Sequence, residues 1–332
     1  MSEKKTIDQM LGAGIIMAPM AGITDTPFRL LVRGYGCAFA FTEMIDVNGV
    51  IYNNRKTFRL MRRIPEDLPL GIQLVGQEED KFLKVAGYCV DMGYRMIDIN
   101  AGCPARKVVK AGKGAALLKQ PRRLERIVRR LSRELDVPVT VKIRAGWDHN
   151  DLNYIEVGRR VQGAGAAAVG IHVRSRAQMY KGNADHSITR RLKRELDIPV
   201  IASGNIFSAR EAIEVMRETS CDAVYAARGA LGRPWIFGDY NALREGREPD
   251  RDVTLTMLKK VMLAHYRLCM KYYDEGRIPG RMYKHITWYL KGFRGLDPVM
   301  RAYRKETGPA AFRAFLERLR ADDRNRLFLK QC

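Results

Sequence analysis

The feature that most constrains this fold is an eightfold alternation between short apolar runs, rich in β-branched residues, and longer segments of helical periodicity. The apolar runs span residues 15–18, 38–45, 70–75, 96–100, 139–143, 169–173, 200–203 and 223–226. Helical segments fall between them, among them 26–34, 78–91, 121–135, 152–162, 208–218 and 235–244. Strands that alternate with helices of this length predict βαβ units and a parallel sheet.

Two repeated transitions support this alternation. The segments LDVPVTVKI (135–143) and LDIPVIAS (196–203) each follow a basic helical stretch, turn at Asp-x-Pro and enter an apolar run. Because proline cannot prolong a helix, each segment indicates a helix end followed by a strand. Eight such units match the number and size of a (β/α)8 barrel, which uses about 250 residues. A doubly wound sheet is the alternative, but units of similar length favour closure.

The pattern changes near residue 250. Segments 254–274, 282–293 and 309–320 have helical periodicity and many basic residues, and no run in this region resembles a strand. We therefore expect two domains, a barrel over residues 1–247 and a small all-helical domain over residues 248–332.

The chain is strongly basic, with 59 Lys and Arg against 37 Asp and Glu and a net charge of +22. Residues 251–332 alone carry 19 Lys and Arg against 8 Asp and Glu. A charge this large opposes compaction and favours a polyanionic partner, for which nucleic acid is the first candidate. A merely solvated surface is the plainer alternative. A membrane partner fits less well, because the basic residues are not gathered in one amphipathic anchor.

No apolar stretch is long enough to span a bilayer, and residues 1–14 contain no apolar core of a secretion signal. We expect a cytoplasmic protein, and a monomer. The cysteines are nowhere closer than 14 positions, so their spacing matches no zinc or iron–sulfur motif and no metal is expected. They are Cys37, Cys89, Cys103, Cys221, Cys269 and Cys332.

Barrel enzymes place their active sites just beyond the C-terminal ends of the strands. Polar and cationic residues gather there in this sequence, and such groups are costly to bury without partners. Their convergence on one mouth therefore predicts a functional site. In strand order the residues at these ends are Pro19, Met20 and Ala21, Gln73, Asn100 and Cys103, Lys142 and Arg144, His172 and Arg174, Gly204 and Asn205, and Arg228 and Gly229.

The last two strands end in SGNI (203–206) and ARGALGRP (227–234), whose glycine amides suit the phosphate site common in barrels. Lys142 adds a positive charge suited to an electron-rich ring that becomes anionic on reduction. Together they indicate a phosphorylated redox cofactor. Glycines that merely form turns, and a lysine that points to water, are the plainer alternatives. No GxGxxG opens an N-terminal βαβ unit, so a Rossmann site is not indicated.

Cys103 lies in NAGCPARKVVKAGKGAALL, between small residues and a loop rich in Gly and Lys. A thiol of ordinary pKa, about 8.5, is protonated at neutral pH and can donate a proton. The cations Arg106, Lys107, Lys110 and Lys113 are expected to lower that pKa, so nucleophilic catalysis stays open. A buried filler cysteine is the third interpretation.

Seven segments resemble, in order, the signatures of the tRNA-dihydrouridine synthases. They are MAPMAGITDTPFR (17–29), GIQLVG (71–76), DINAGCPARKV (98–108), VKIRAGWD (141–148), HVRSRAQMYKG (172–182), SGNI (203–206) and RGALGRPWIF (228–237). The resemblance covers the whole chain, its NxGCPxxKV segment is especially specific, and it is greatest to the bacterial B-type enzymes.

This resemblance implies an FMN-binding TIM barrel followed by a helical tRNA-binding domain. FMN, reduced by NADPH, would deliver a hydride to C6 of a uridine in tRNA, and Cys103 would protonate C5 to give 5,6-dihydrouridine. Carried over by position, the FMN-binding residues would be Pro19, Met20, Ala21, Gln73, Lys142, His172, Ser203, Gly204, Asn205, Ala227 and Arg228. The substrate would be bound by Asn100, Lys107, Arg144 and Arg174.

Three positions depart from the family pattern: Ala227 where a glycine is common, Val173 where a small residue is common, and SGN where relatives often have NG.

A uridine in folded RNA must be unstacked before it can meet a flavin, which requires backbone contacts that the basic segments supply. For the aromatic residues of 283–293 core packing is favoured over stacking on RNA. The alternative functions are the same chemistry on ribosomal RNA, flavin-dependent reduction of a free pyrimidine, and RNA binding by a barrel without chemistry.

Overall fold

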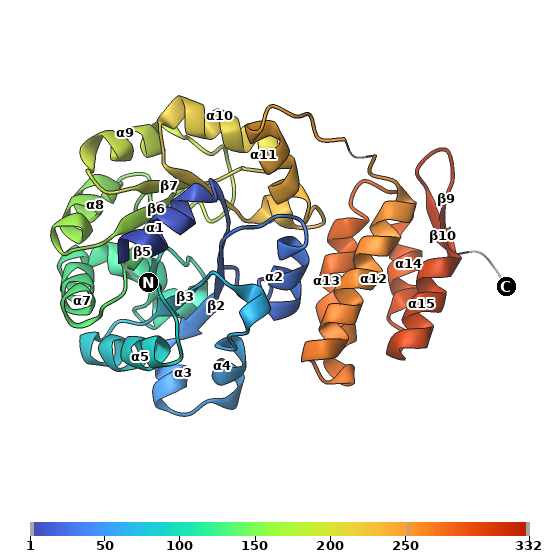
Figure 1. The fold of residues 1–332 in the computed structure, drawn as a ribbon, viewed down its shortest axis with the longest axis horizontal. Coiled ribbons are helices and arrows are strands. Elements are labelled where there is room, and N and C mark those ends of the chain that lie inside the picture. Colours follow the sequence, from blue (N-terminus) through green and yellow to red (C-terminus); the bar gives the residue numbers. More distant parts are fainter. Residues whose placement is uncertain (1–2, 251, 330–332) are drawn as a thin grey trace.

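In the computed structural model, which describes residues 3–250 and 252–329, eight parallel strands form a closed barrel (Figure 1). The strands are β1 (Ile15–Met17), β2 (Ala40–Asp46), β3 (Leu70–Val75), β4 (Ile97–Ala101), β5 (Val139–Arg144), β6 (Ala168–His172), β7 (Val200–Ser203) and β8 (Ala223–Ala226). They pair in chain order, and β8 closes on β1 with Ile16 opposite Tyr225. All eight predicted strands are confirmed to within two residues, and closure excludes the doubly wound alternative.

Helices surround the barrel and return the chain to the start of each next strand. The long ones are α2 (Thr26–Arg33), α5 (Glu79–Asp91), α7 (Pro121–Glu134), α8 (Tyr154–Gly163), α9 (Ser187–Glu195), α10 (Ala209–Thr219) and α11 (Ile236–Arg244). Shorter ones are α3 (Val47–Ile51) and α4 (Arg55–Leu60) after β2, α6 (Arg106–Lys110) after β4, and the 3-10 turns η1 (Pro65–Asp67), η2 (Gly114–Lys119) and η3 (Arg228–Ala230). Each long helix buries one apolar face, as α7 does with Leu124, Ile127, Val128 and Leu131.

The N-terminal half of the barrel interior is filled by apolar side chains. The rings of Phe41 and Tyr225 lie 6.1 Å apart there, and a Cβ at Gly71 would meet the Phe41 ring. Helix α1 (Glu3–Gly12), which the sequence did not predict, packs its Met10 against this cluster. Because this part of the interior is filled, any ligand site must lie at the opposite end, above these rings.

Helices α12 (Leu255–Tyr272), α13 (Ile278–Tyr289), α14 (Leu296–Tyr303) and α15 (Gly308–Arg318) form a bundle beside the barrel, with the 3-10 turn η4 (Glu275–Arg277) before α13 (Figure 1). Its core stacks Tyr266 on Phe312 with ring centroids 4.0 Å apart. The helical character predicted for this region is confirmed. None of the helices within residues 3–250 and 252–329 combines the length and the apolar character that a bilayer crossing requires.

The expectation that no strand follows residue 250 is wrong. Strands β9 (Leu319–Ala321) and β10 (Leu327–Leu329) form an antiparallel hairpin, and the helix predicted to reach residue 320 ends at Arg318. The hairpin turn is held by Asp322, whose Oδ1 accepts hydrogen bonds from the backbone of Arg324 and Arg326. Strands of three residues are too short to show a period of two in the sequence.

The bundle contacts the barrel at helix α2. The Phe28 ring lies 5.6 Å from the ring of His265 on α12 and 4.9 Å from that of His285 on α13. Beside this contact, the carboxylate of Asp25 accepts hydrogen bonds from Tyr273 Oη at 2.8 Å and from Arg281 Nη1 at 3.0 Å. The bundle is therefore attached to the loop between β1 and α2, at the C-terminal end of the barrel.

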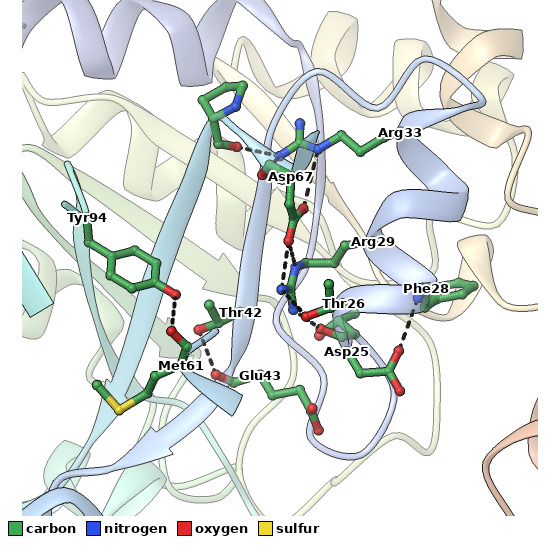
Figure 2. Close-up of polar contacts among 12 residues, drawn as sticks. Asp25, Thr26, Phe28, Arg29, Arg33, Thr42, Glu43, Met61, Asp67 and Tyr94 are labelled. Atoms are coloured by element: carbon green, nitrogen blue, oxygen red, sulfur yellow. Dashed lines mark hydrogen bonds and ion pairs between the residues drawn. The ribbon is translucent and has the colours of Figure 1, made fainter. Parts of the chain in front are cut away.

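Figure 2 shows the barrel side of this junction, where charged side chains are buried. Arg29 donates from Nε to Asp67 Oδ2 at 2.8 Å, and from Nη1 to the carbonyl of Thr24 at 2.6 Å. The side chain of Arg29 is 1% exposed and that of Asp67 is fully buried. In the same region Glu43 accepts a hydrogen bond from the backbone of Gly22. These contacts fix the path of the loop that follows β1.

Candidate active site

A cavity of about 520 Å³ opens at the C-terminal ends of the strands, and every strand or the loop after it contributes to its wall. All the predicted site residues except Arg174, Lys107 and Gly229 line it. Those that do are Pro19, Met20, Ala21, Gln73, Asn100, Cys103, Lys142, Arg144, His172, Ser203, Gly204, Asn205, Ala227 and Arg228.

Arg174 lies outside the cavity wall and supports it from behind. Its buried guanidinium donates to the carbonyls of Lys181, at 3.0 Å, and Gly182, at 2.5 Å, and to Asn205 Oδ1 at 2.9 Å. It therefore ties the loop after β6 to the end of β7. Lys107 lies on the exposed surface of helix α6, which begins five residues after the end of β4, and it does not line the cavity.

A chain of hydrogen bonds crosses the cavity floor, and it begins at Asp98. The two carboxylate oxygens of Asp98 accept from Thr140 Oγ1 and from Gln73 Nε2, both at 2.6 Å. Gln73 Oε1 in turn accepts from Asn100 Nδ2 at 2.7 Å. An ionised carboxylate can only accept hydrogen bonds, so Asp98 determines which end of the Gln73 amide faces it.

The chain ends on the backbone at Cys103. Asn100 Oδ1 accepts from the N–H of Cys103 at 2.8 Å and from that of Gly102 at 3.2 Å. The amide oxygen can face these two donors only because Gln73 accepts from the other end of the Asn100 amide. The orientation set at Asp98 is thereby passed through two amides to the turn that carries the thiol.

The floor region holds two ionisable groups of opposite charge: the buried carboxylate of Asp98, which does not line the cavity, and the half-buried ammonium of Lys142, which does. Burial raises the pKa of Asp98 to about 6, although its hydrogen bonds to Thr140 and Gln73 and the charge of Lys142 act in the other direction. Burial lowers the pKa of Lys142 to about 8, and the Asp98 charge partly compensates. The Lys142 ammonium lies 5.1 Å from the centre of the Tyr225 ring. At pH 7 the floor carries one carboxylate and one ammonium.

The thiol of Cys103 is half-buried, and this burial raises its pKa above the ordinary value. The expectation that the lysines and arginine after Cys103 would lower that pKa is therefore wrong. Lys113 folds back into an ion pair with Asp46 at 2.7 Å, and the side chains of Arg106, Lys107 and Lys110 are exposed to solvent. Cys103 therefore stays a neutral thiol, a proton donor, at neutral pH.

Arg144 joins two of the loops that surround the mouth. Its guanidinium donates to the carbonyl of Gly102 at 2.8 Å, to that of Ser175 at 3.0 Å and to that of Met179 at 2.7 Å. Burial lowers its pKa to about 10, so it remains charged at pH 7. Its guanidinium also lies 5.3 Å from the centre of the exposed Tyr180 ring, which lines the cavity.

His172 presents an acceptor beside the end of β7. Its Nδ1 lies 3.1 Å from the carbonyl of Ser203, which makes Nδ1 the donor and leaves a lone pair on Nε2. Burial and the cations around it, Arg144 first, hold the pKa of His172 far below its usual range, so the ring is neutral. The Nε2 atom is buried and has no hydrogen-bond partner among the described residues.

Backbone geometry leaves the neighbouring wall free of side chains. Gly204 has φ +140°, and a Cβ there would lie 2.9 Å from Val173 Cγ2, so this position requires glycine. Ala227 has a negative φ of −110°, so the departure from glycine there does not place a side chain in the left-handed region. The Arg228 guanidinium lies at the rim, 5.2 Å from the Phe207 ring centre and 3.2 Å from Asn205 Oδ1.

The sequence analysis missed several residues of the site. Asp98, which is fully buried and does not line the cavity, lies two residues before Asn100 on the same strand, so the period of two along a strand could have identified it. Tyr180 and Phe207 belong to loops and carry no periodic signal. Trp288 comes from helix α13 of the bundle and reaches the cavity, although its neighbour Tyr289 is core as expected. In residues 3–250 and 252–329, no group of three His, Cys, Asp or Glu is placed to hold a metal ion.

Comparison with known proteins gives consistent matches. The family described as dihydrouridine synthase (Dus) matches residues 16–322. The chain is 38% identical over 277 residues to the tRNA-dihydrouridine synthase B of Xanthomonas axonopodis pv. citri, covering 83% of each chain. It is 36% identical over 296 residues to that of Pasteurella multocida, covering 89% of each. Histamine dehydrogenase from Rhizobium sp. 4-9 shares the fold, with TM-score 0.54, 11% identity and coverage of 77% of this chain and 49% of that one.

Proposed function

This chain belongs to the dihydrouridine synthase family, and on that premise we propose that it uses FMN, reduced by NADPH, to convert specific uridines of tRNA to 5,6-dihydrouridine. The enzyme is an oxidoreductase of that family. One observation supports this chemistry above the others: a protonated thiol, Cys103, stands at the mouth of a cavity whose floor carries the Lys142 ammonium and two oriented amides.

The residues present fit a flavin mononucleotide. No described carboxylate lies within ion-pair distance of the Lys142 ammonium, and the buried Nε2 of His172 lacks a partner. A ring with carbonyl oxygens and a chain with hydroxyl donors would satisfy both groups. The volume of about 520 Å³ is typical of a cofactor site.

The proposal assigns the predicted cofactor residues to two ends of the FMN and to the wall between them. Gln73 and Lys142 would bind the pyrimidine edge of the ring. The strand-end backbone beside Gly204, with the Arg228 guanidinium, would bind the phosphate. The remaining cofactor-binding residues of the proposal are Pro19, Met20, Ala21, His172, Ser203, Asn205 and Ala227.

When bound, reduced FMN supplies the hydride that adds to C6 of the uracil. The Cys103 Sγ–H supplies the proton that adds to C5, so the C5–C6 double bond gains two electrons and two hydrogens. Asn100 and Arg144 orient the uracil, and both side chains are held by the hydrogen bonds described above. Arg174 acts through the loop it supports, and Lys107 contacts the RNA outside the cavity.

We also propose the division of labour between the two parts of the chain. Residues 1–247 form the FMN-binding catalytic domain, and residues 248–332 form a basic tRNA-binding domain. Residues 251–332 contain 19 Lys and Arg against 8 Asp and Glu, and this positive charge supports the assignment of tRNA binding to the second domain.

The test is a map of dihydrouridine in total tRNA and ribosomal RNA from cells with and without the gene. Loss at defined tRNA positions is the expected result. Loss confined to ribosomal RNA would retain the chemistry and overturn the substrate. If neither RNA changes, and the purified protein reduces free uridine with NADPH, the free-pyrimidine alternative replaces the proposal.

A further inference from the structure

A second cavity, of about 650 Å³, lies between the segment after β2 and the end of helix α12. One wall is helix α4 and the turn that follows it, with Arg55, Arg59 and Arg62. The opposite wall is formed by Tyr272 and Arg277. Phe58, Met61 and Met92 add apolar surface to this cavity. We call this cavity the arginine groove.

The groove carries more positive charge than its surroundings neutralise. Arg59 and Arg277 share one carboxylate, that of the exposed Asp274, at 4.0 and 3.5 Å. Arg62 lies over the Tyr272 ring, 5.2 Å from its centre. Among described residues, no carboxylate lies within ion-pair distance of Arg55. Four guanidinium groups therefore face one carboxylate.

The sequence concentrates this charge. The segment RKTFRLMRR (55–63) contains five Lys and Arg in nine residues. An exposed cluster of guanidinium groups suits anions with several oxygens, because each group offers parallel donors in a planar fork. The pattern differs from an ordinary solvated helix face, where opposite charges alternate.

Helix α13 connects the groove to the active-site cavity. Arg277 precedes its first residue, Arg281 contacts Asp25 one turn later, and Trp288 lines the cavity near its end. These positions are spaced so that they share one face of the helix. Eleven residues of helix span about 16 Å. Each strand of a duplex carries one phosphate per about 3.4 Å of helix axis, so this length corresponds to a few nucleotides.

We propose that the arginine groove binds the phosphodiester backbone of the substrate tRNA, a few nucleotides from the uridine held in the cavity. The proposal rests on the proposed function, since it assigns the groove to the same RNA. A chain of phosphates is favoured over a single free anion because the guanidinium groups are spread over both walls of an open groove.

The test compares two charge-matched double variants of the full chain. Arg55→Glu with Arg59→Glu reverses the charge of one groove wall. Arg194→Glu with Arg217→Glu makes the same change at exposed positions in the last turns of α9 and α10, at the barrel end opposite the cavity. Unmodified tRNA transcript is the probe, and binding, its salt dependence and dihydrouridine formation are measured for each protein.

The groove variant should raise the Kd and the KM for tRNA about tenfold or more while kcat changes less than about twofold. The slope of log Kd against log salt should fall by about 0.7–0.9 for each phosphate that the variant no longer neutralises. The control should differ from wild type by less than about twofold. FMN content and thermal unfolding verify that the groove variant is folded, and Arg59→Lys, which keeps the charge, should retain most of the binding.

Equal tRNA binding by the groove variant and the control would overturn the proposal, as would weaker binding with an unchanged salt slope. If wild type forms dihydrouridine in tRNA and the groove variant matches it, only the groove assignment fails. If wild type binds and modifies no tRNA, the proposed function itself fails. The groove binds a free anion instead if two results are found together. Inorganic phosphate at millimolar concentration stabilises wild type and control, but not the groove variant, against thermal unfolding, and the groove variant binds tRNA normally.

Discussion

The carboxylate of Asp98 determines which way the amide of Asn100 faces, although Gln73 lies between them. Each amide has a donor end and an acceptor end, and Asp98 accepts at both oxygens. Reversing the first amide would place two donors or two acceptors face to face at the next contact. The orientation of Asn100, and with it the turn at Cys103, therefore depends on one buried negative charge.

Replacing Asp98 with Asn should lower kcat roughly 10–100-fold, because the new amide can donate and the chain can reverse. The matched control is Thr140→Val, which removes the other donor to Asp98 but leaves the bond to Gln73. Single-turnover reduction of tRNA by the pre-reduced enzyme gives the rate. Equal rates for the two variants would contradict this role of Asp98.

The pKa of about 6 at Asp98 predicts an acid limb in the pH profile. Below that pH the carboxyl gains a proton and can donate, so turnover should fall as pH decreases through about 6. In Thr140→Val the limb should move to higher pH, since the hydrogen bond from Thr140 helps to lower the pKa of Asp98. An unchanged limb in that variant would assign the acid limb to another group.

Replacing Cys103 with Ala should reduce turnover about 10²–10⁴-fold, the usual contribution of a general acid, while FMN content and tRNA binding stay unchanged. Because burial raises the pKa of this thiol, iodoacetamide at pH 7 should alkylate it more slowly than free cysteine. Mass spectrometry of the labelled peptide measures that rate. Fast labelling at neutral pH would indicate a thiolate and favour a nucleophilic role.

Lys142 should make FMN affinity depend on pH. Its pKa of about 8 means that the free protein loses this charge as pH rises through 8, so the Kd for FMN should rise above that pH. Arginine stays charged there, so Lys142→Arg should remove this pH dependence. Lys142→Met should bind FMN weakly and without a step near pH 8. Flavin fluorescence titration between pH 6.5 and 9.5 measures all three proteins.

Arg281→Met should destabilise the protein by about 1.5–3 kcal/mol, because the buried Asp25 carboxylate loses a charge-assisted hydrogen bond. The control is Lys284→Met at an exposed position of the same helix, where a change within about 0.5 kcal/mol is expected. Urea unfolding at pH 7 provides both values. Equal stability of the two variants would show that Arg281 contributes nothing to attaching the bundle.

The barrel was predictable because each strand is a buried apolar run bounded by polar turns, as at Val139–Arg144 after Asp-x-Pro. Helix α1 and the hairpin of β9 and β10 were not predictable in this way. The first has a weak apolar face in a charged segment, and the strands of the second are three residues long.

The candidate site was likewise predictable in part from the sequence. Residues at strand ends, such as Gln73 and Lys142, were identified because a barrel brings those ends together. The pKa of Cys103 was misjudged, because Lys113 folds onto Asp46 and the exposure of the other cations cannot be read from their spacing. Trp288 reaches the cavity through the docking of α13, a tertiary contact that no local pattern encodes.

The position of Trp288 in the sequence also determines the order in which the parts of the cavity wall are synthesised. The barrel strands are all synthesised by residue 226, but this wall comes from residue 288. A nascent chain that has folded only its barrel therefore has an unfinished mouth, wider than the mature one. The part of the cavity wall that Trp288 forms is completed only after helix α13 has left the ribosome and docked on the barrel.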